Sequence, residues 1–120
     1  MSTLVAQTIS NGTVSTSSAN VIQGSAKAWV NFNGTNGSIR ASYNVSSVTR
    51  NGTGDYTVNY TNAFADANYA AVYGSGYSGG SDNSLKWAEG ASLYSTTAIR
   101  LYNVGSSFGD STQNSVAIFR

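Results

Sequence analysis

The chain of 120 residues contains no cysteine, no histidine and no proline. Without histidine a serine nucleophile has no general base, and without cysteine the chain has neither a thiolate nucleophile nor a disulfide. Zinc sites draw mainly on these same two residue types, so we expect no structural zinc. Turns must depend on the 13 glycines instead of on proline. We therefore expect a domain that is not an enzyme and that binds no cofactor.

Charged side chains are also scarce. They make up 9% of the chain, against roughly 25% in an ordinary soluble domain, and the net charge is only +1. The cations are scattered, so no basic stripe is present to displace counterions from nucleic acid. No stretch approaches the roughly 20 apolar residues of a membrane span, and Met1–Ser10 lacks the pattern of a signal peptide. We expect no nucleic-acid partner and no membrane insertion.

Carboxylates are the remaining candidates for catalysis or metal binding. Glycosidases need two of them roughly 5 to 9.5 Å apart, and nothing in the sequence brings two together. Asp82, Asn83 and Asp110 lie in Gly/Ser-rich loops and could supply oxygen ligands to calcium. They lack the spacing of a calcium-binding loop, so we interpret them as ordinary polar loop residues. The five acids of the chain are Asp55, Asp66, Asp82, Glu89 and Asp110.

Four Asn-Gly pairs punctuate the chain, beginning at Asn11, Asn33, Asn36 and Asn51. Both residues tolerate positive φ, which two-residue hairpin turns require, and apolar residues alternate beside these pairs. No segment keeps a 3.6-residue apolar period over three turns, so no substantial helix is expected. The pattern predicts strands over Leu4–Ile9, Ala26–Phe32, Ser38–Val48, Asp55–Thr61, Tyr69–Tyr73, Ser84–Ala88, Ser92–Thr97, Ala98–Val104 and Ser115–Phe119.

Short strands joined by such turns indicate an all-β fold, an antiparallel β-sandwich or barrel-like domain with little or no helix. A chain of this length is expected to form one domain. Residues 25–120 are predicted to be that domain. Residues 1–24 are polar and partly of low complexity, and they form either a flexible lead-in or a connector that docks on neighbouring chains.

Alternation along the strands predicts two side chains at an oligomer interface. Trp29 lies on the side of its strand that faces away from the predicted core, and the last strand, Val116–Phe119, is apolar on both sides. One thin sandwich does not easily hide both features, so we predict a homo-oligomer with Trp29 and Phe119 in its interface. The alternative is a half-exposed Trp29 and a central C-terminal strand. The predicted core faces carry Ala28, Val30, Phe32, Ile39, Ala41, Tyr43, Val45, Tyr56, Val58 and Tyr60.

Two irregular stretches, Gly74–Asn83 and Gly105–Asn114, combine Gly and Ser with aromatic and polar residues. Such loops are typical of adaptable binding surfaces, in which aromatic rings give apolar platforms and polar groups give orientation. An alternative places Tyr73 and Trp87 in the core. Arg100 and Tyr102 alternate with apolar neighbours, which predicts that they face outward in a cross-strand role. The candidate ligand-binding residues are Tyr73, Tyr77, Asp82, Asn83, Trp87 and Phe108.

Several blocks of the sequence occur in a recognisable order: SANVIQGSAK from Ser18, KAWVNFNGT from Lys27, IRASYNVSSV from Ile39, NGTGDYTVNYT from Asn51 and DANYA from Asp66. Together these blocks resemble a conserved segment of bacteriophage tail-fibre and other virion proteins. The resemblance covers a third to a half of the chain and does not extend from Tyr73 to Arg120. It implies a β-rich domain, usually trimeric, that contacts a bacterial surface or caps a fibre, and it transfers no catalytic or ligand residues.

Two functions follow as expectations. The first is a non-catalytic fibre or adhesin domain that binds a bacterial surface glycan or envelope protein as a homotrimer. The second is a structural virion protein, in the head decoration, collar or fibre shaft, that binds other virion subunits. Both imply a protein that is assembled in the host cytoplasm and located in the virion.

Overall fold

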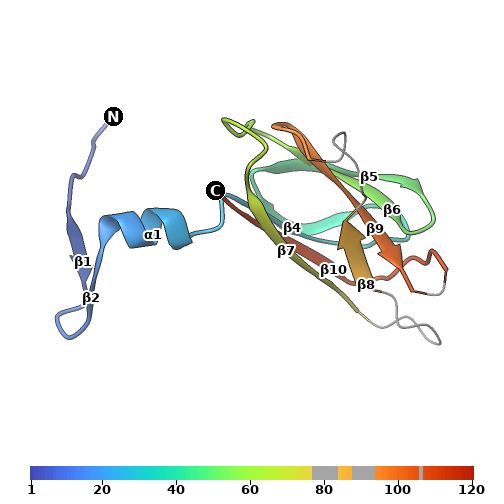
Figure 1. The fold of residues 1–120 in the computed structure, drawn as a ribbon, viewed down its shortest axis with the longest axis horizontal. Helices are drawn as coiled ribbons and strands as arrows, with labels where there is room; N and C mark the ends of the chain where they lie inside the picture. The colour runs from blue at the N-terminus through green and yellow to red at the C-terminus, as the bar shows by residue number, and fades with distance from the viewer. Residues whose placement is uncertain (77–83, 88–93, 106) are drawn as a thin grey trace.

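The computed structural model describes residues 1–76, 84–87, 94–105 and 107–120. Two four-stranded antiparallel sheets form a sandwich, and a two-stranded hairpin and a short helix precede it (Figure 1). The all-β prediction is therefore confirmed. The two sheets stay separate in the described residues, so the sandwich is the correct one of the two predicted architectures.

The first sheet has the strand order β4-β3-β10-β7, in which every neighbouring pair is antiparallel. The C-terminal strand β10 is central, as the alternative interpretation proposed, because β3 and β7 pair with its two edges. Trp29 in β3 is 40% exposed, in agreement with that same alternative. The strands of this sheet are β3 (Ala28–Phe32), β4 (Ile39–Tyr43), β7 (Ala70–Ser75) and β10 (Asn114–Phe119).

The second sheet has the order β5-β6-β9-β8 and is also antiparallel throughout. The predicted strand Asp55–Thr61 is observed as β6, and its three alternating core residues, Tyr56, Val58 and Tyr60, are all buried. The strands of this sheet are β5 (Val45–Gly52), β6 (Asp55–Tyr60), β8 (Ser84–Trp87) and β9 (Ala98–Val104).

The core lies between the sheets and follows the period-two alternation of the central strands. Phe32 from the first sheet meets Tyr56 from the second edge-to-face, with ring centroids 5.2 Å apart. Near the other end of the core, Tyr60 and Tyr69 make a similar contact at 6.0 Å. Aromatic pairs of this kind stabilise a core by about 0.5–1.5 kcal/mol beyond their buried area. The remaining core residues are mainly Val30, Val45, Val48, Val58, Ile99, Leu101, Val116 and Ile118.

The predicted single strand Ser38–Val48 is wrong, because the chain leaves one sheet and enters the other at Asn44. That residue has φ 53°, a left-handed conformation that asparagine tolerates better than most residues. Its side chain accepts from the amide of Asn62 at 2.8 Å and donates to the Lys27 carbonyl at 3.2 Å, which fixes the corner. In β4, Ala41 and Tyr43 pair with Asn31 and Trp29 on the outer side of β3, so they are exposed and are not core residues as predicted.

The Asn-Gly pairs predict turns correctly at three places. Asn11–Gly12 joins two N-terminal strands, and the two pairs in 33–37 lie in the connection between β3 and β4. The fourth prediction is wrong, because Asn51 and Gly52 belong to β5 and the turn lies at Thr53 and Gly54, where Gly54 has φ 66°. The Asn51 side chain donates across the ladder to Asp55 and Thr57, which keeps it in the strand.

The strand predicted over Ser92–Thr97 is also corrected. Residues 92–93 lie outside the described residues, and from Tyr94 to Thr97 the chain forms a turn with a single bridge, Tyr94 to Ile99. The Ser95 hydroxyl accepts from the amides of Thr97 and Ala98 at 3.3 and 2.9 Å. A serine side chain that competes for local amides in this way favours a turn over a strand.

The first 25 residues form an arm that extends away from the sandwich (Figure 1). It consists of β1 (Thr8–Ser10), β2 (Ser15–Ser17) and α1 (Ser18–Gly24), so the strand predicted at Leu4 begins only at Thr8. Ser17 caps the helix by accepting from the amide of Asn20. The radius of gyration of the chain is 16.6 Å, whereas a compact domain of this length has roughly 14 Å. The arm accounts for the elongated shape.

Candidate functional site

The end of the sandwich opposite the arm, called here the distal end, gathers three connections among the described residues. They are the β3–β4 loop, the tight β5–β6 turn at Thr53 and Gly54, and the β9–β10 loop at 105–113. The antiparallel order of both sheets brings these connections to the same end, while the C-terminus lies beside the arm (Figure 1). Any site at the distal end therefore points away from the arm.

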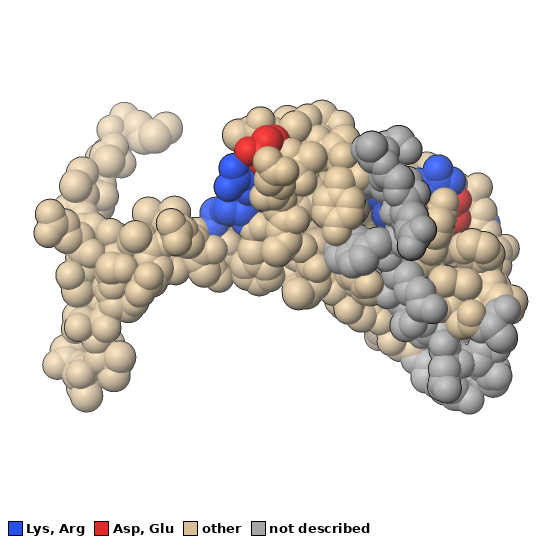
Figure 2. Space-filling model, in the orientation of Figure 1, with Lys and Arg blue, Asp and Glu red and all other residues tan. Residues whose placement is uncertain are grey.

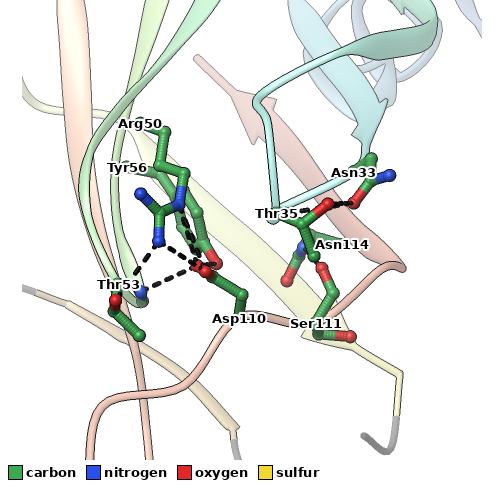
Figure 3. A network of polar contacts seen from close by, with 9 residues as sticks. Asn33, Thr35, Arg50, Thr53, Tyr56, Asp110, Ser111 and Asn114 are labelled. Carbon is green, nitrogen blue, oxygen red and sulfur yellow. Dashed lines mark hydrogen bonds and ion pairs between the residues drawn. The ribbon is translucent and has the colours of Figure 1, made fainter.

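Asp110 anchors the β9–β10 loop to this end (Figure 3). Its carboxylate accepts from Arg50 Nη2 at 2.6 Å, from the Tyr56 hydroxyl at 2.7 Å and from the amide of Gly54 at 2.9 Å. Partial burial alone would disfavour the charge, but these donors outweigh it and hold the pKa of the Asp110 carboxyl below its usual value. The carboxylate is ionised and fully engaged, so it acts as a structural clamp.

Gly34 allows the loop to approach the first sheet closely. Its amide donates to the Ser111 carbonyl at 2.9 Å, and the Asn114 side chain donates to the same carbonyl at 2.8 Å. A Cβ atom at Gly34 would lie 2.6 Å from that carbonyl and 2.8 Å from Asn114 Nδ2. Only glycine fits here without a shift of the backbone. The loop is thus fastened to both sheets, by Asp110 on one side and Ser111 on the other.

The fastened loop presents Phe108, which is 52% exposed. Its ring stands edge-on to Tyr102 of β9, with centroids 5.3 Å apart. The Arg100 guanidinium lies over the Tyr102 ring, 5.6 Å from its centroid, and donates to the Asp55 carboxylate in two hydrogen bonds of 2.9 and 2.6 Å. Phe108, Tyr102, Arg100 and Asp55 together are called the distal patch. It combines an apolar platform with a charged pair whose donors and acceptor reach solvent.

The rest of the outer face of the second sheet is polar and internally hydrogen-bonded. Asn59 in β6 donates to Ser47 at 3.0 Å and to Thr49 at 3.1 Å, both in β5. Asn51 extends this ladder to Thr57 at 2.9 Å. The described side chains of β5 and β6 thus satisfy one another across the two strands.

The outer face of the first sheet is different. Tyr43, Trp29, Ala117 and Val72 are direct register partners across β4, β3, β10 and β7, so they form one row across the sheet, called here the apolar row. Tyr43, Trp29 and Val72 are 58%, 40% and 57% exposed. Phe119, opposite Ala70 and two residues beyond Ala117, shares this face. The two residues predicted for an oligomer interface therefore lie on one surface.

The predicted ligand-binding residues are only partly brought together. Phe108 is exposed in the distal patch, whereas Tyr73 in β7 is half-buried and packs against the core, as the alternative interpretation proposed. The backbone of Trp87 pairs with Leu101, and its side chain lies outside the described residues. The other three predicted residues, Tyr77, Asp82 and Asn83, also lie outside the described residues.

Three members of the distal patch, Asp55, Arg100 and Tyr102, were not predicted as site residues from the sequence. Arg100 and Tyr102 were correctly expected to face outward, but nothing in the sequence showed that β9 pairs with β6 and so brings Arg100 to Asp55. Their alternation with buried Ile99 and Leu101 was the available signal. The contact with Phe108 depends on the path of the loop, which the Asp110 clamp determines.

The three carboxylates among the described residues are each paired with an arginine. Asp55 pairs with Arg100, Asp110 with Arg50, and Asp66 with Arg120 at 2.6 Å. Hydrogen bonds from arginine lower the pKa of Asp55 and of Asp66. A general acid needs a raised pKa, so these three groups do not fit that role. Within the described part of the chain, no three His, Cys, Asp or Glu side chains gather as a metal site. Asp82 and Asn83, considered above for calcium, lie outside that part.

No helix in the described ranges is long and apolar enough to cross a membrane. Comparison of the chain with protein-family models, curated proteins and solved structures finds no match.

Proposed function

We propose that this chain is a non-catalytic virion module of the tail-fibre type that works as a homo-oligomer and binds the surface of a bacterial host through its distal patch. The bound group would be a surface glycan or an exposed part of an envelope protein. The observation that carries this proposal is the exposed Phe108 ring, held against Tyr102 beside the Arg100–Asp55 pair.

The chemistry of the distal patch suits a carbohydrate. Sugars present an apolar C–H face that packs on aromatic rings and a rim of hydroxyl groups that need donors and acceptors. Phe108 supplies an exposed ring, while the Arg100 guanidinium and the Asp55 carboxylate supply donors and acceptors at its edge. Asp55 is 18% exposed and Arg100 41% exposed, so both remain accessible to a hydroxyl group.

The position of the patch also supports the proposal. It lies at the end of the sandwich away from the arm and the C-terminus, where a fibre would face its target (Figure 1). The ordered blocks between Ser18 and Ala70 resemble tail-fibre proteins, in which oligomers are usual. An oligomer presents several copies of a weak site, and linked sites raise the overall avidity by roughly 10² to 10⁴ without new contacts.

Binding of the labelled full chain to a panel of bacterial strains and to a glycan array tests the proposal. We expect Phe108→Ala to lower binding by at least tenfold, because the apolar platform is lost. Ser47→Ala, on the same outer face in β5, is the matched control and should bind as the unchanged chain does. Equal binding by Phe108→Ala, or no binding of the unchanged chain to any strain or glycan, would contradict the assignment.

A structural virion protein is the second candidate, and the arm is the observation that favours it. The arm exposes Leu4, Val5 and Val14 by 91%, 89% and 68%, as expected of a segment that docks on another subunit. This candidate predicts that substitutions in the arm impair virion assembly, while Phe108→Ala leaves both assembly and adsorption unchanged. Counting assembled particles and measuring their adsorption to host cells separates the two functions.

A further inference from the structure

We infer that the arm of one copy of this chain docks on the apolar row of a neighbouring copy, so that the oligomer forms by exchange of arms. The inference rests on the homo-oligomeric part of the proposed function and adds to it which two surfaces meet. It is carried by two uncovered apolar surfaces on one chain, one on the arm and one on the sandwich.

The acceptor surface is a groove in the outer face of the first sheet. It has a volume of about 370 Å³ and runs along β10, with Trp29 on one side and Val72 on the other. Its floor carries the small side chains Ser115 and Ala117, so it is shallow between two bulky walls. No charged side chain lines it in the described residues. Such a groove accepts apolar side chains of a partner and offers no ionic contact.

The donor surface is the arm. Residues 1–26 contain no charged side chain, and Figure 2 shows the arm without any acidic or basic colouring. Leu4, Val5 and Ile22 are 91%, 89% and 62% exposed, and together with Ile9 they border a hollow of about 350 Å³. The hollow on the arm and the groove on the sheet are both mainly apolar and carry no charge, so they can pack together without desolvating an ion.

The arm is held away from the sandwich of its own copy. The Lys27 ammonium donates to the carbonyls of Ile22 and Ser25, at the end of α1, while the Lys27 amide donates to the Ile118 carbonyl at 2.7 Å. Lys27 thus ties the last turn of the helix to the first sheet. With this tie the arm points outward and leaves its own apolar row uncovered (Figure 1). The row is therefore open to another molecule, and a second copy brings a matching uncharged apolar surface, its own arm.

The chain exposes more surface than a compact monomer of its mass. It exposes 7076 Å², whereas a compact monomer of 12.5 kDa exposes about 6,200 Å². The extended arm accounts for the excess, and docking on a neighbour would bury it. An arm that docks on a neighbour's sheet gives an interface between two different surfaces, and such contacts close into rings or continue as filaments. The homotrimer expected from the sequence would be one such ring.

The absence of cysteine permits a clean test by cross-linking. Ile22→Cys places a thiol on the arm, and Val72→Cys or Tyr43→Cys places one at either end of the apolar row. The two full-length variants are co-expressed with different affinity tags, purified through both tags and treated with a short bis-maleimide. Ser47→Cys, exposed on the outer face of the second sheet, replaces the acceptor as the matched control.

We expect the arm–row pairs to give a product of twice 12.5 kDa at a yield at least tenfold above the arm–control pair. Equal yields would overturn the inference. So would strong self-linking of Val72→Cys alone, which indicates face-to-face packing, or of Ile22→Cys alone, which indicates arm-to-arm packing. Failure to co-purify through both tags would overturn it as well, because the chain would then be a monomer.

This test separates the inference from host binding. Cross-linked oligomers that bind no bacterial surface leave the inference intact and contradict the proposed adhesion. A monomer that binds cells and loses binding with Phe108→Ala contradicts the inference and leaves the distal patch as the binding site.

Discussion

The two outer faces of the sandwich differ in how they meet solvent. On the second sheet, Asn59, Asn51 and Arg100 bond to side chains on neighbouring strands, so the described polar groups of β5, β6 and β9 find partners within one subunit. On the first sheet, Tyr43, Trp29 and Val72 lie in one row with large exposed fractions. Polar side chains there are few, and Asn31 and Ser115 bond to each other beside the row. The two faces therefore differ in polarity, and we propose that the apolar face serves assembly while the polar face ends at the binding patch.

The largest expected difference is in self-association, between a charge placed in the apolar row and a charge placed on the polar face of the second sheet. Val72→Glu should weaken self-association at least roughly 100-fold, because burying an unpaired carboxylate costs several kcal/mol. Ser47→Glu on the polar face should leave association unchanged. Sedimentation of both variants over a range of concentrations measures the effect. Equal association of the two variants would break the distinction between the faces.

Removal of the Asp110 clamp is the next largest effect. Asp110→Ala leaves the Tyr56 hydroxyl and the Gly54 amide without their acceptor, and charge-assisted bonds of this kind contribute about 1.5–3 kcal/mol each. We expect a loss of about 2–4 kcal/mol in the free energy of unfolding, measured by urea denaturation. Asp66→Asn, which breaks an exposed ion pair, should cost much less. A stability of Asp110→Ala equal to that of the unchanged chain would contradict the clamp.

Lowering the pH should destabilise the folded subunit without weakening the association between subunits. The folded-state pKa of Asp55, of Asp66 and of Asp110 is lowered, so each contributes stability above its unfolded pKa of about 3.9. That stability is lost as the pH falls through the folded pKa, because the unfolded state then binds more protons. The melting temperature should therefore fall steadily below about pH 4. The apolar row carries no carboxylate, so association should persist until the subunit unfolds.

The smallest expected effect concerns the polar ladder. Asn59→Ala removes two side-chain hydrogen bonds on a partly exposed face and should lower the free energy of unfolding by about 1 kcal/mol. Self-association should not change. A clear loss of association in this variant, measured by light scattering, would show that the polar face also takes part in assembly.

The sequence predicted the parts of the fold that follow from local alternation. Tyr56, Val58 and Tyr60 are buried as their spacing required, and Trp29 lies on the opposite, outer side of its strand. The corner at Asn44 was missed, because apolar alternation continues across it and a left-handed asparagine leaves no mark in the pattern. The turn at Gly54 was misplaced by two residues because an Asn-Gly pair competed with it.

The sites were less predictable because they depend on pairing between distant strands. Phe108 was identified from its loop, but its neighbours Tyr102, Arg100 and Asp55 come together only through the order β6-β9. Trp29 and Phe119, predicted for an oligomer interface, could be named one by one from apolar positions that the predicted core did not use. They lie on a single face because β10 is central and pairs with β3, and local patterns do not encode this strand order.

The mass of the full chain in solution, measured by light scattering, tests the central claim most directly. An apolar row that is covered by neighbouring copies predicts a stable oligomer, with a mass near three times 12.5 kDa for the expected trimer. A mass of 12.5 kDa that persists at high concentration would contradict the claim, because the apolar row would then stay exposed to water.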